Sequence, residues 1–172
     1  MPRYAAFLRG INVGGTRITK DKLCEPFSAL GFEDVTTFRA SGNVIFDAPR
    51  AAAATLAAQI EQRLADDLGF TKAVTFIRTA AEMKAIAELD PLPPEPEQKL
   101  QVMLLLRAPD KAVLERATAD DRLALGPREL YWLPKARMTD SELDLKAIEK
   151  QIGPTTTRTK GTLDQIAERY FS

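Results

Sequence analysis

A proline-rich stretch in the middle of the chain is the feature that most constrains how this sequence can fold. The segment Asp90–Glu97 contains prolines at positions 91, 93, 94 and 96. Proline fixes φ and has no amide hydrogen, so the segment cannot be a helix interior or a central strand, and it is typical of a stiff spacer. We therefore predict an N-terminal lobe over residues 1–89, a linker over 90–99 and a C-terminal lobe over 100–172.

Apolar periodicity and turn residues in the first lobe predict the element order β-α-β-β-α-β, followed by one more helix. The expected strands are 4–9, 35–39, 43–47 and 73–78, and the expected helices are 19–30, 51–68 and 80–89. The helix over 51–68 has an apolar residue at every fourth position from Leu56, and Gly69 follows it as a stop signal. Thr79 and Glu82 have the spacing of a capping box. This order is typical of the ferredoxin-like arrangement.

The second lobe begins the same pattern again. Strands are expected at 100–107, 122–125 and 129–133, and helices at 110–118 and 140–152. A last helix over about 160–170 stands where a fourth strand would complete the order, so this lobe reads β-α-β-β-α with an extra helix. We predict an α+β fold of two ferredoxin-like units in tandem with antiparallel sheets. The element order repeats, whereas the residues themselves show no repeat. One continuous sheet shared by both lobes is the alternative.

Composition excludes several kinds of site. The chain has no histidine and a single cysteine, Cys24. This excludes Ser-His-Asp and Cys-His catalysis, histidine-ligated zinc and an intrachain disulfide. We expect no metal in a specific site and no cofactor. Any catalysis would use carboxylates, Lys, Tyr, Ser/Thr, Cys24, backbone amides or a hard metal.

Charge and hydropathy bear on location and partners. Lys and Arg together number 24 and Asp and Glu together number 24, so no overall basic field draws in nucleic acid. No apolar run reaches the length of a signal-peptide core or a membrane span. We expect a cytoplasmic protein with no membrane partner; the sequence does not indicate an oligomeric state.

The loop after the first strand is rich in glycine and arginine. Residues 9–17 read Arg-Gly-Ile-Asn-Val-Gly-Gly-Thr-Arg. Glycines let backbone amides approach a ligand, and a helix start downstream favours an anion. The spacing of Gly10 and Gly15 begins like a P-loop, but Thr16-Arg17 replaces the required Lys-Ser/Thr, which argues against a nucleotide triphosphatase. A tight loop that needs its glycines for geometry alone is the other interpretation.

A second turn should lie beside this loop. Ser41, Gly42 and Asn43 join the second and third strands. In a ferredoxin-like sheet the first and third strands are antiparallel neighbours, so the end of one lies beside the start of the other. We predict that one edge presents an anion-binding patch, with the ligand-binding residues Arg9, Asn12, Gly14, Gly15, Ser41 and Asn43. A simple hairpin turn is the other interpretation of the stretch Ala40–Asn43.

Two further stretches bear on binding. Thr155–Thr162 places hydroxyls, Arg158 and Lys160 before the last helix, so Arg158 joins the predicted ligand-binding residues; a surface helix cap is the other interpretation. The third strand occupies the place where RNA-recognition modules carry stacking aromatics. It holds one aromatic residue, Phe46, and lacks the basic-Gly-aromatic signature, so nucleic acid is a disfavoured but not excluded partner.

Several motifs together resemble a bacterial protein family, the domain of unknown function 1697. They are Leu8–Gly15, Ala29–Phe32, Ala40–Phe46 and Leu130–Pro134. The resemblance implies a small bacterial α+β protein with no established activity. The tail of this family commonly reads Thr-x-Arg-Asn-Trp-Asn-Thr; Thr156–Thr162 keeps the arginine as Arg158 and lacks the Asn-Trp-Asn.

The residues favour binding over catalysis, because no acid and base stand at a diagnostic spacing. The leading hypothesis is a binding module for a small anionic ligand that bears phosphate or carboxylate. The alternatives are a histidine-independent enzyme that acts on such a ligand and a protein-interaction scaffold.

Overall fold

The computed structural model describes residues 1–11, 18–39, 42–135, 137–138 and 141–172. Its contacts divide the chain into two compact units. Unit 1 comprises Met1–Lys84 together with Arg169–Ser172, and unit 2 comprises Ala85–Glu168. The first change of unit falls within a helix, between Lys84 and Ala85, and the chain returns to unit 1 for its last four residues. The linker predicted at 90–99 stays a prediction.

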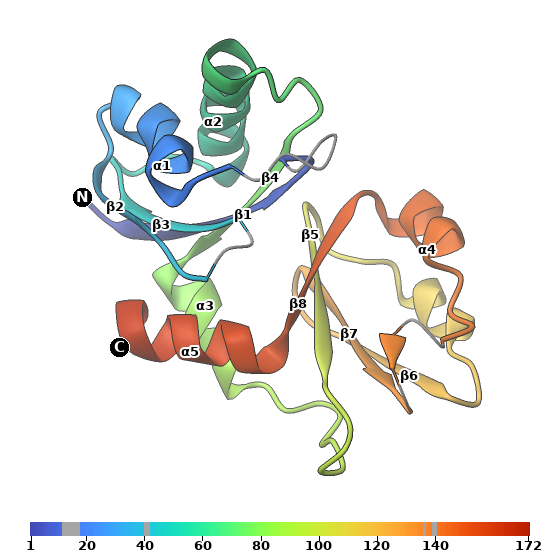
Figure 1. The fold of residues 1–172 in the computed structure, drawn as a ribbon. Coiled ribbons are helices and arrows are strands. Elements are labelled where there is room, and N and C mark those ends of the chain that lie inside the picture. The colour runs from blue at the N-terminus through green and yellow to red at the C-terminus, as the bar shows by residue number, and fades with distance from the viewer. Residues whose placement is uncertain (12–17, 40–41, 136, 139–140) are drawn as a thin grey trace. The chain divides into compact units, whose positions relative to one another are not determined.

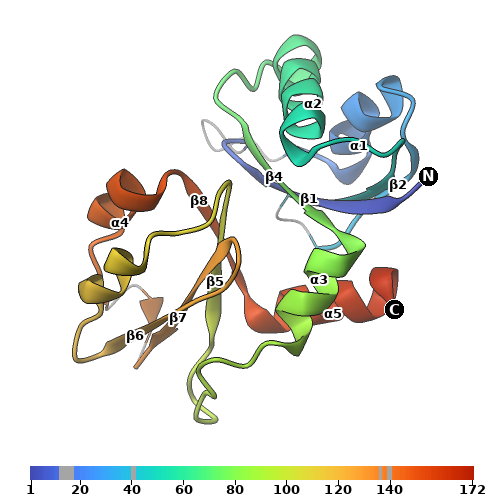
Figure 2. The same cartoon turned by 180° about the vertical axis from the view of Figure 1, so that it is seen from behind.

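Unit 1 is built on a four-stranded antiparallel sheet with the order β2-β3-β1-β4 (Figure 1). Its strands are β1 Arg3–Arg9, β2 Glu33–Thr37, β3 Asn43–Asp47 and β4 Val74–Thr79. Its helices are α1 Lys20–Ala29 and α2 Ala53–Leu68, and α3 Ala80–Glu88 begins in this unit. Both α1 and α2 lie on one face of the sheet (Figures 1 and 2).

The apolar stripe of α2 explains why this helix forms and where it packs. Leu56, Ile60 and Leu64 are buried, in one cluster with Phe27 of α1 and Phe46 of β3. The four-residue spacing puts the three α2 side chains on one helix face, toward the sheet. The helix ends as predicted, at a left-handed Gly69 with φ of 76°.

Unit 2 repeats this architecture with the strand order β6-β7-β5-β8, again fully antiparallel. Its strands are β5 Gln101–Leu105, β6 Asp121–Leu125, β7 Glu129–Pro134 and β8 Thr155–Thr159. The 3-10 helix η2 Lys111–Arg116 and the α-helix α4 Leu145–Ile152 lie between strands, and α5 Lys160–Phe171 follows β8. The core of this unit includes Met103, Leu130, Trp132 and Ile148.

The predicted fold class is confirmed: the chain is α+β with two four-stranded antiparallel sheets. The alternative of one continuous sheet is wrong, because no ladder joins the two sheets in the described part of the chain. The second unit was predicted without a fourth strand, and this is wrong too. Thr155–Thr159 forms β8 and pairs with β5, since β-branched threonines suit an extended backbone.

The predicted helix boundaries differ most from the observed ones in unit 2. The helix expected over 110–118 is the short 3-10 helix η2, and the helix expected over 140–152 begins only at Leu145, where the Asp144 carboxylate caps it by accepting from the Ala147 amide. Among the described residues, no helix combines the length and apolar character needed to cross a membrane.

Candidate functional site

The sheet of unit 1 brings three segments to one edge. Arg9 ends β1 and pairs with Val74 at the start of β4, while Phe7 pairs with Asn43 at the start of β3. The Leu8 amide also donates to the Gly42 carbonyl at 2.9 Å. The end of β1 therefore lies beside the start of β3, as predicted.

Two glycines allow these segments to approach closely. Gly10 has φ of 83°, and a Cβ added there would lie 2.8 Å from the Lys72 carbonyl oxygen. Gly42 has φ of 74°, and its Cβ would lie 3.0 Å from Cδ1 of Ile11. Any larger residue would be strained at both positions, because positive φ disfavours side chains and the space is occupied. The loop after β1 thus touches both the turn before β3 and the approach to β4.

The three segments that meet at this edge carry cations and no acid of their own, and the carboxylate of Glu61 on α2 adjoins them by accepting from the Thr75 amide at 2.7 Å. Arg9, Arg39 and Lys72 are exposed and come from three different segments. The stretches 5–20, 35–46 and 68–81, which contain these cations, hold no Asp or Glu. The chain as a whole is neutral, so the edge concentrates positive charge that the rest of the molecule balances. We call Arg9, Arg39 and Lys72 the cationic edge of unit 1.

Arg39 is held in an uncommon backbone conformation. Its φ is 60°, and its guanidinium carbon lies 5.4 Å from the centre of the Phe38 ring. This is within the range of a cation–π contact. The Arg39 guanidinium therefore lies beside the ring of the residue that precedes it.

The predicted site residue Asn43 is part of the turn. Its side chain is 2% exposed, and its Nδ2 donates to the Phe38 carbonyl at 3.1 Å. The Phe38 amide in turn donates to the Asn43 carbonyl at 3.0 Å. Asn43 therefore closes the turn across its two ends, and its burial keeps the amide away from solvent.

Other predicted site residues fall elsewhere. Asn12, Gly14, Gly15 and Ser41 lie outside the described residues. The assignment of these four to a ligand-facing edge therefore stays a prediction.

Arg158 belongs to unit 2, where it lies on β8. The stretch was predicted as a loop before a helix, which is wrong, because Arg158 pairs with Val102 of β5. Its Nη1 donates to Thr156 Oγ1 at 2.7 Å and to the Thr157 carbonyl at 3.0 Å. Burial lowers the pKa of the Arg158 guanidinium to about 10. Its role in ligand binding remains a prediction.

Sequence reasoning missed two members of the cationic edge, Arg39 and Lys72. Neither stands in a recognisable motif, and both are single cations between apolar or small residues. The available signal was the absence of acids from the stretches 35–46 and 68–81. This absence indicates a cationic edge only when the strand order is known, because the strand order brings the two stretches together. Among the described residues, no three acidic or cysteine side chains gather in a way that could hold a metal ion.

Comparisons with known proteins agree with this architecture. A family model described as "Protein of unknown function (DUF1697)" matches residues 1–131. No curated protein matches the chain. The fold is similar to the structure of the conserved bacterial protein SP0830 from Streptococcus pneumoniae, with a TM-score of 0.75 and 22% sequence identity over 97% of each chain. That likeness concerns the fold alone.

Proposed function

Because this chain belongs to the DUF1697 family of proteins of unknown function, its role has to be argued from its own residues, and we propose that it binds a small anionic ligand at the cationic edge of unit 1. The single observation that supports this proposal is the meeting of three acid-free segments, each with an exposed cation, at one end of one sheet.

Electrostatics favours an anion at this edge. Cations of like sign that are held near one another repel, and an anion between them relieves the repulsion. A guanidinium can also offer a carboxylate or a phosphate two parallel hydrogen bonds. The pairing of Arg9 with Val74 and the approach of Gly10 to the Lys72 carbonyl place the backbones of these two cations at the same edge.

The helix α1 follows the loop after β1 in the sequence. Thr19 caps this helix, and its side chain accepts from the Lys22 amide at 3.2 Å. The N-terminus of a helix has a partial positive charge, which stabilises an anion nearby. The sequence between Ile11 and Ile18 contributes Arg17 and further glycines and no acid. We infer that the ligand bears phosphate or carboxylate and that nucleic acid is a less suitable partner.

A ligand screen with matched variants tests the proposal. The protein is titrated with inorganic phosphate, pyrophosphate and nucleoside monophosphates, and the melting temperature and calorimetric affinity are measured. A ligand at about 100 times its Kd should add roughly 2.7 kcal/mol to the free energy of unfolding. Arg9→Ala should weaken binding about ten- to hundredfold, because a charge-assisted contact contributes about 1.5–3 kcal/mol.

Arg50→Ala is the control, since Arg50 is exposed and follows the opposite end of β3. It removes the same charge from unit 1 and should leave the affinity unchanged. The stability of unliganded Arg9→Ala should stay within about 0.5 kcal/mol of the wild type, as for most surface changes. If Arg9→Ala instead melts at a lower temperature and binds every anion as the wild type does, the arginine is a structural residue and the proposal fails.

A further inference from the structure

The two units repeat one another residue by residue at their fourth strands. Thr75–Thr79 reads Thr-Phe-Ile-Arg-Thr and Thr155–Thr159 reads Thr-Thr-Thr-Arg-Thr, so both match the pattern Thr-x-x-Arg-Thr. Each stretch is the last strand of its sheet, and each is followed at once by a helix. The residues thus repeat where the sequence had shown only a repeated element order.

The first threonines of the two stretches make the same contact. The Thr75 amide donates to a carboxylate oxygen of Glu61 on α2 at 2.7 Å. The Thr155 amide donates to a carboxylate oxygen of Glu149 on α4 at 3.2 Å. In both units a glutamate of the preceding helix therefore fixes the start of the fourth strand.

The ends of the two stretches match as well. Nη1 of Arg78 donates to the carbonyl of the residue before it at 2.9 Å, and Nη1 of Arg158 does the same at 3.0 Å. The last threonines, Thr79 and Thr159, each accept at Oγ1 from the amide three residues later, at 3.2 Å in both cases. Three shared contacts in five residues identify equivalent positions in the two units.

The sheet register extends the equivalence to the edge of unit 1 described above. Leu8 donates its amide to the Gly42 carbonyl at 2.9 Å, and Leu105 donates its amide to the Arg128 carbonyl at 3.0 Å. Leu8 pairs with Thr75, and Leu105 pairs with Thr155. The end of β5, the turn before β7 and the start of β8 in unit 2 therefore correspond to the edge of unit 1.

This edge of unit 2 also carries cations. The stretches 105–109, 126–128 and 150–155 meet there and contain no Asp or Glu, whereas Glu129 begins β7 beside the turn and Glu149 accepts from the Thr155 amide. Arg107, two residues after Leu105, occupies the place that Gly10 has in unit 1. Its guanidinium atoms lie 3.7–3.9 Å from the position of a Cβ on Gly153, so the arginine lies against the segment that leads into β8.

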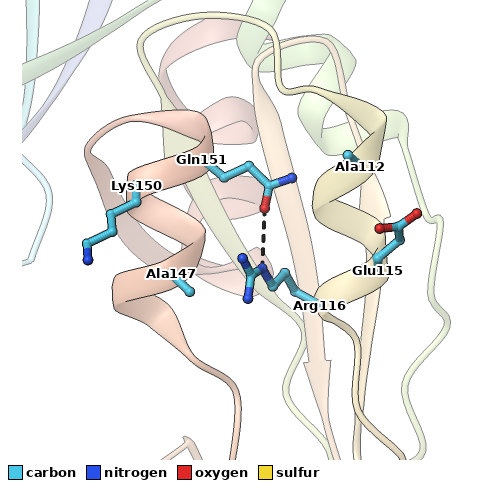
Figure 3. Close-up of a pocket in the computed structure, with 6 residues that line it drawn as sticks. All are labelled: Ala112, Glu115, Arg116, Ala147, Lys150 and Gln151. Carbon is cyan, nitrogen blue, oxygen red and sulfur yellow. Dashed lines mark hydrogen bonds between the residues drawn. The ribbon is translucent and has the colours of Figure 1, made fainter.

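A groove adjoins the edge. It lies between η2 and α4 and has a volume of about 680 Å³, within the range of small-molecule sites. Arg116 and Lys150 line it, and Nε of Arg116 donates to Gln151 Oε1 at 3.3 Å across the groove (Figure 3). The last turn of α4, with Lys150 and Gln151, directly precedes Gly153. The end of α4 therefore belongs to both features: Lys150 and Gln151 line the groove, and the following Gly153 lies against Arg107 at the edge.

One acid, Glu115, also lines this groove. Figure 3 shows its carboxylate turned away from the Arg116 guanidinium. Ala112 and Ala147 also line the groove, one from each helix, and the Arg116–Gln151 hydrogen bond spans the gap between the helices. The cations are therefore presented at a hollow and not on a flat surface.

We propose that unit 2 contains a second anion-binding site, formed by Arg107 at the end of β5 and by Arg116 and Lys150 in the adjoining groove. It takes a small molecule that bears phosphate or carboxylate. The ligand class rests on the proposed function of unit 1, whereas the place of the site rests on the repeated contacts. Where unit 1 has Gly10 and Gly42, unit 2 has Arg107 and Arg128 at the equivalent positions.

Titration with pyrophosphate, followed through the backbone amides by NMR, tests both sites in one experiment. In the wild type, the amides of Leu105 and Gly153 should shift along one saturating curve and those of Leu8 and Gly10 along another. Arg107→Ala should weaken the first curve about tenfold or more and leave the second unchanged. Arg9→Ala should do the reverse.

Arg122→Ala is the matched control, because Arg122 is exposed on β6 at the opposite end of the same sheet. It should change neither curve. If only the unit 1 amides respond, the second site is disproved and the proposed function stands. If only the unit 2 amides respond, the proposed function of unit 1 is disproved and the second site stands. No response in either unit overturns both. Equal weakening by Arg122→Ala and Arg107→Ala would show diffuse charge attraction and would also overturn the second site.

Discussion

Asp121 is a buried carboxylate whose two oxygens accept three hydrogen bonds from side chains. Oδ1 accepts from Trp132 Nε1 at 2.8 Å and from Ser141 Oγ at 2.6 Å, and Oδ2 accepts from Thr118 Oγ1 at 2.6 Å. Burial alone would raise the pKa of Asp121, but the three hydrogen bonds outweigh it and hold this pKa below its ordinary value. The ionised carboxylate therefore joins the start of β6 to β7 and to the segment before α4.

The sign of this shift gives a pH prediction. A carboxyl whose pKa is lower in the folded state stabilises the fold above its unfolded pKa, about 3.9 for Asp, and this contribution is lost as the pH falls through the folded value. Asp121→Asn should lower the free energy of unfolding at neutral pH by about 1–3 kcal/mol, since one accepting oxygen becomes an NH2 group and the remaining hydrogen bonds lose the negative charge. The variant should also lose part of its acid sensitivity below about pH 4.

Denaturation followed by the fluorescence of Trp132, the only tryptophan in the chain, measures both effects. Asp120→Asn is the control, because the neighbouring Asp120 is exposed and its Oδ1 lies 3.7 Å from Nζ of Lys135, which is exposed as well. This change should cost little at any pH. A wild-type stability that does not differ from that of Asp121→Asn between pH 2 and 7 would contradict the assignment.

For Asn43, the sequence predicted the turn but not the direction of the side-chain amide. Its type and position predicted a turn, and the turn is present. Whether its amide faced solvent or the turn itself depended on the register of β3 against β1, because neighbouring residues of a strand point to opposite faces. The pairing of Asn43 with Phe7 decides this, and no local pattern contains that information.

At the scale of elements, the start of α2 is a weak point. Its N-cap is Ala52, which makes no side-chain hydrogen bond although its backbone has the extended conformation of a cap. Ala52→Ser should therefore raise the free energy of unfolding by about 0.5–2 kcal/mol by accepting from a free amide of the first turn. Chemical denaturation measures the gain. The same change at exposed Ala58, inside the helix, should instead cost a few tenths of a kcal/mol, roughly the propensity difference. Equal effects at the two sites would show that capping is not involved.

Elements with strong local signals could be predicted, and those that depend on pairing could not. The stripe of α2 and its stop at Gly69 were visible in the sequence, and so was the capping box of α3, in which Thr79 and Glu82 exchange hydrogen bonds at 3.0 and 3.2 Å. Strand β8 was missed because its threonines carry no apolar alternation. Their extended state is stabilised by pairing with β5, a partner some 50 residues earlier in the sequence.

The candidate site divides in the same way. The order of elements was enough to place the end of β1 beside the turn before β3, so this part of the site could be predicted. Lys72 could not, because its position depends on the pairing of β4 with β1 and on the close approach of the Gly10 backbone. A cation such as Lys72, which stands in no motif, can be assigned to a site only when the strand pairing shows which residues lie beside it.

At the scale of the whole molecule, unit 1 is discontinuous: it needs the last four residues of the chain as well as the first 84. The Tyr170 ring packs edge-on against Phe38 with their centres 6.2 Å apart, and the Arg169 guanidinium carbon lies 5.4 Å from the centre of the Tyr170 ring. The Tyr170 carbonyl also accepts from Nη1 of Arg3 at 3.5 Å. The end of the chain thus supports the strand β2 and the turn that follows it.

A double-mutant cycle on Phe38 and Tyr170 measures how much the ring contact contributes. Phe38→Ala, Tyr170→Ala and the double variant should give a coupling free energy of about 0.5–1.5 kcal/mol, the range for aromatic pairs beyond their area burial. Tyr170→Phe keeps the ring and should keep most of the stability. Because Phe38 also accepts from Asn43 through its carbonyl, loosening Tyr170 should increase hydrogen exchange in the turn beside the cationic edge. A coupling near zero, with unchanged exchange at residues 38 and 43, would mean that the end of the chain does not support this turn in solution.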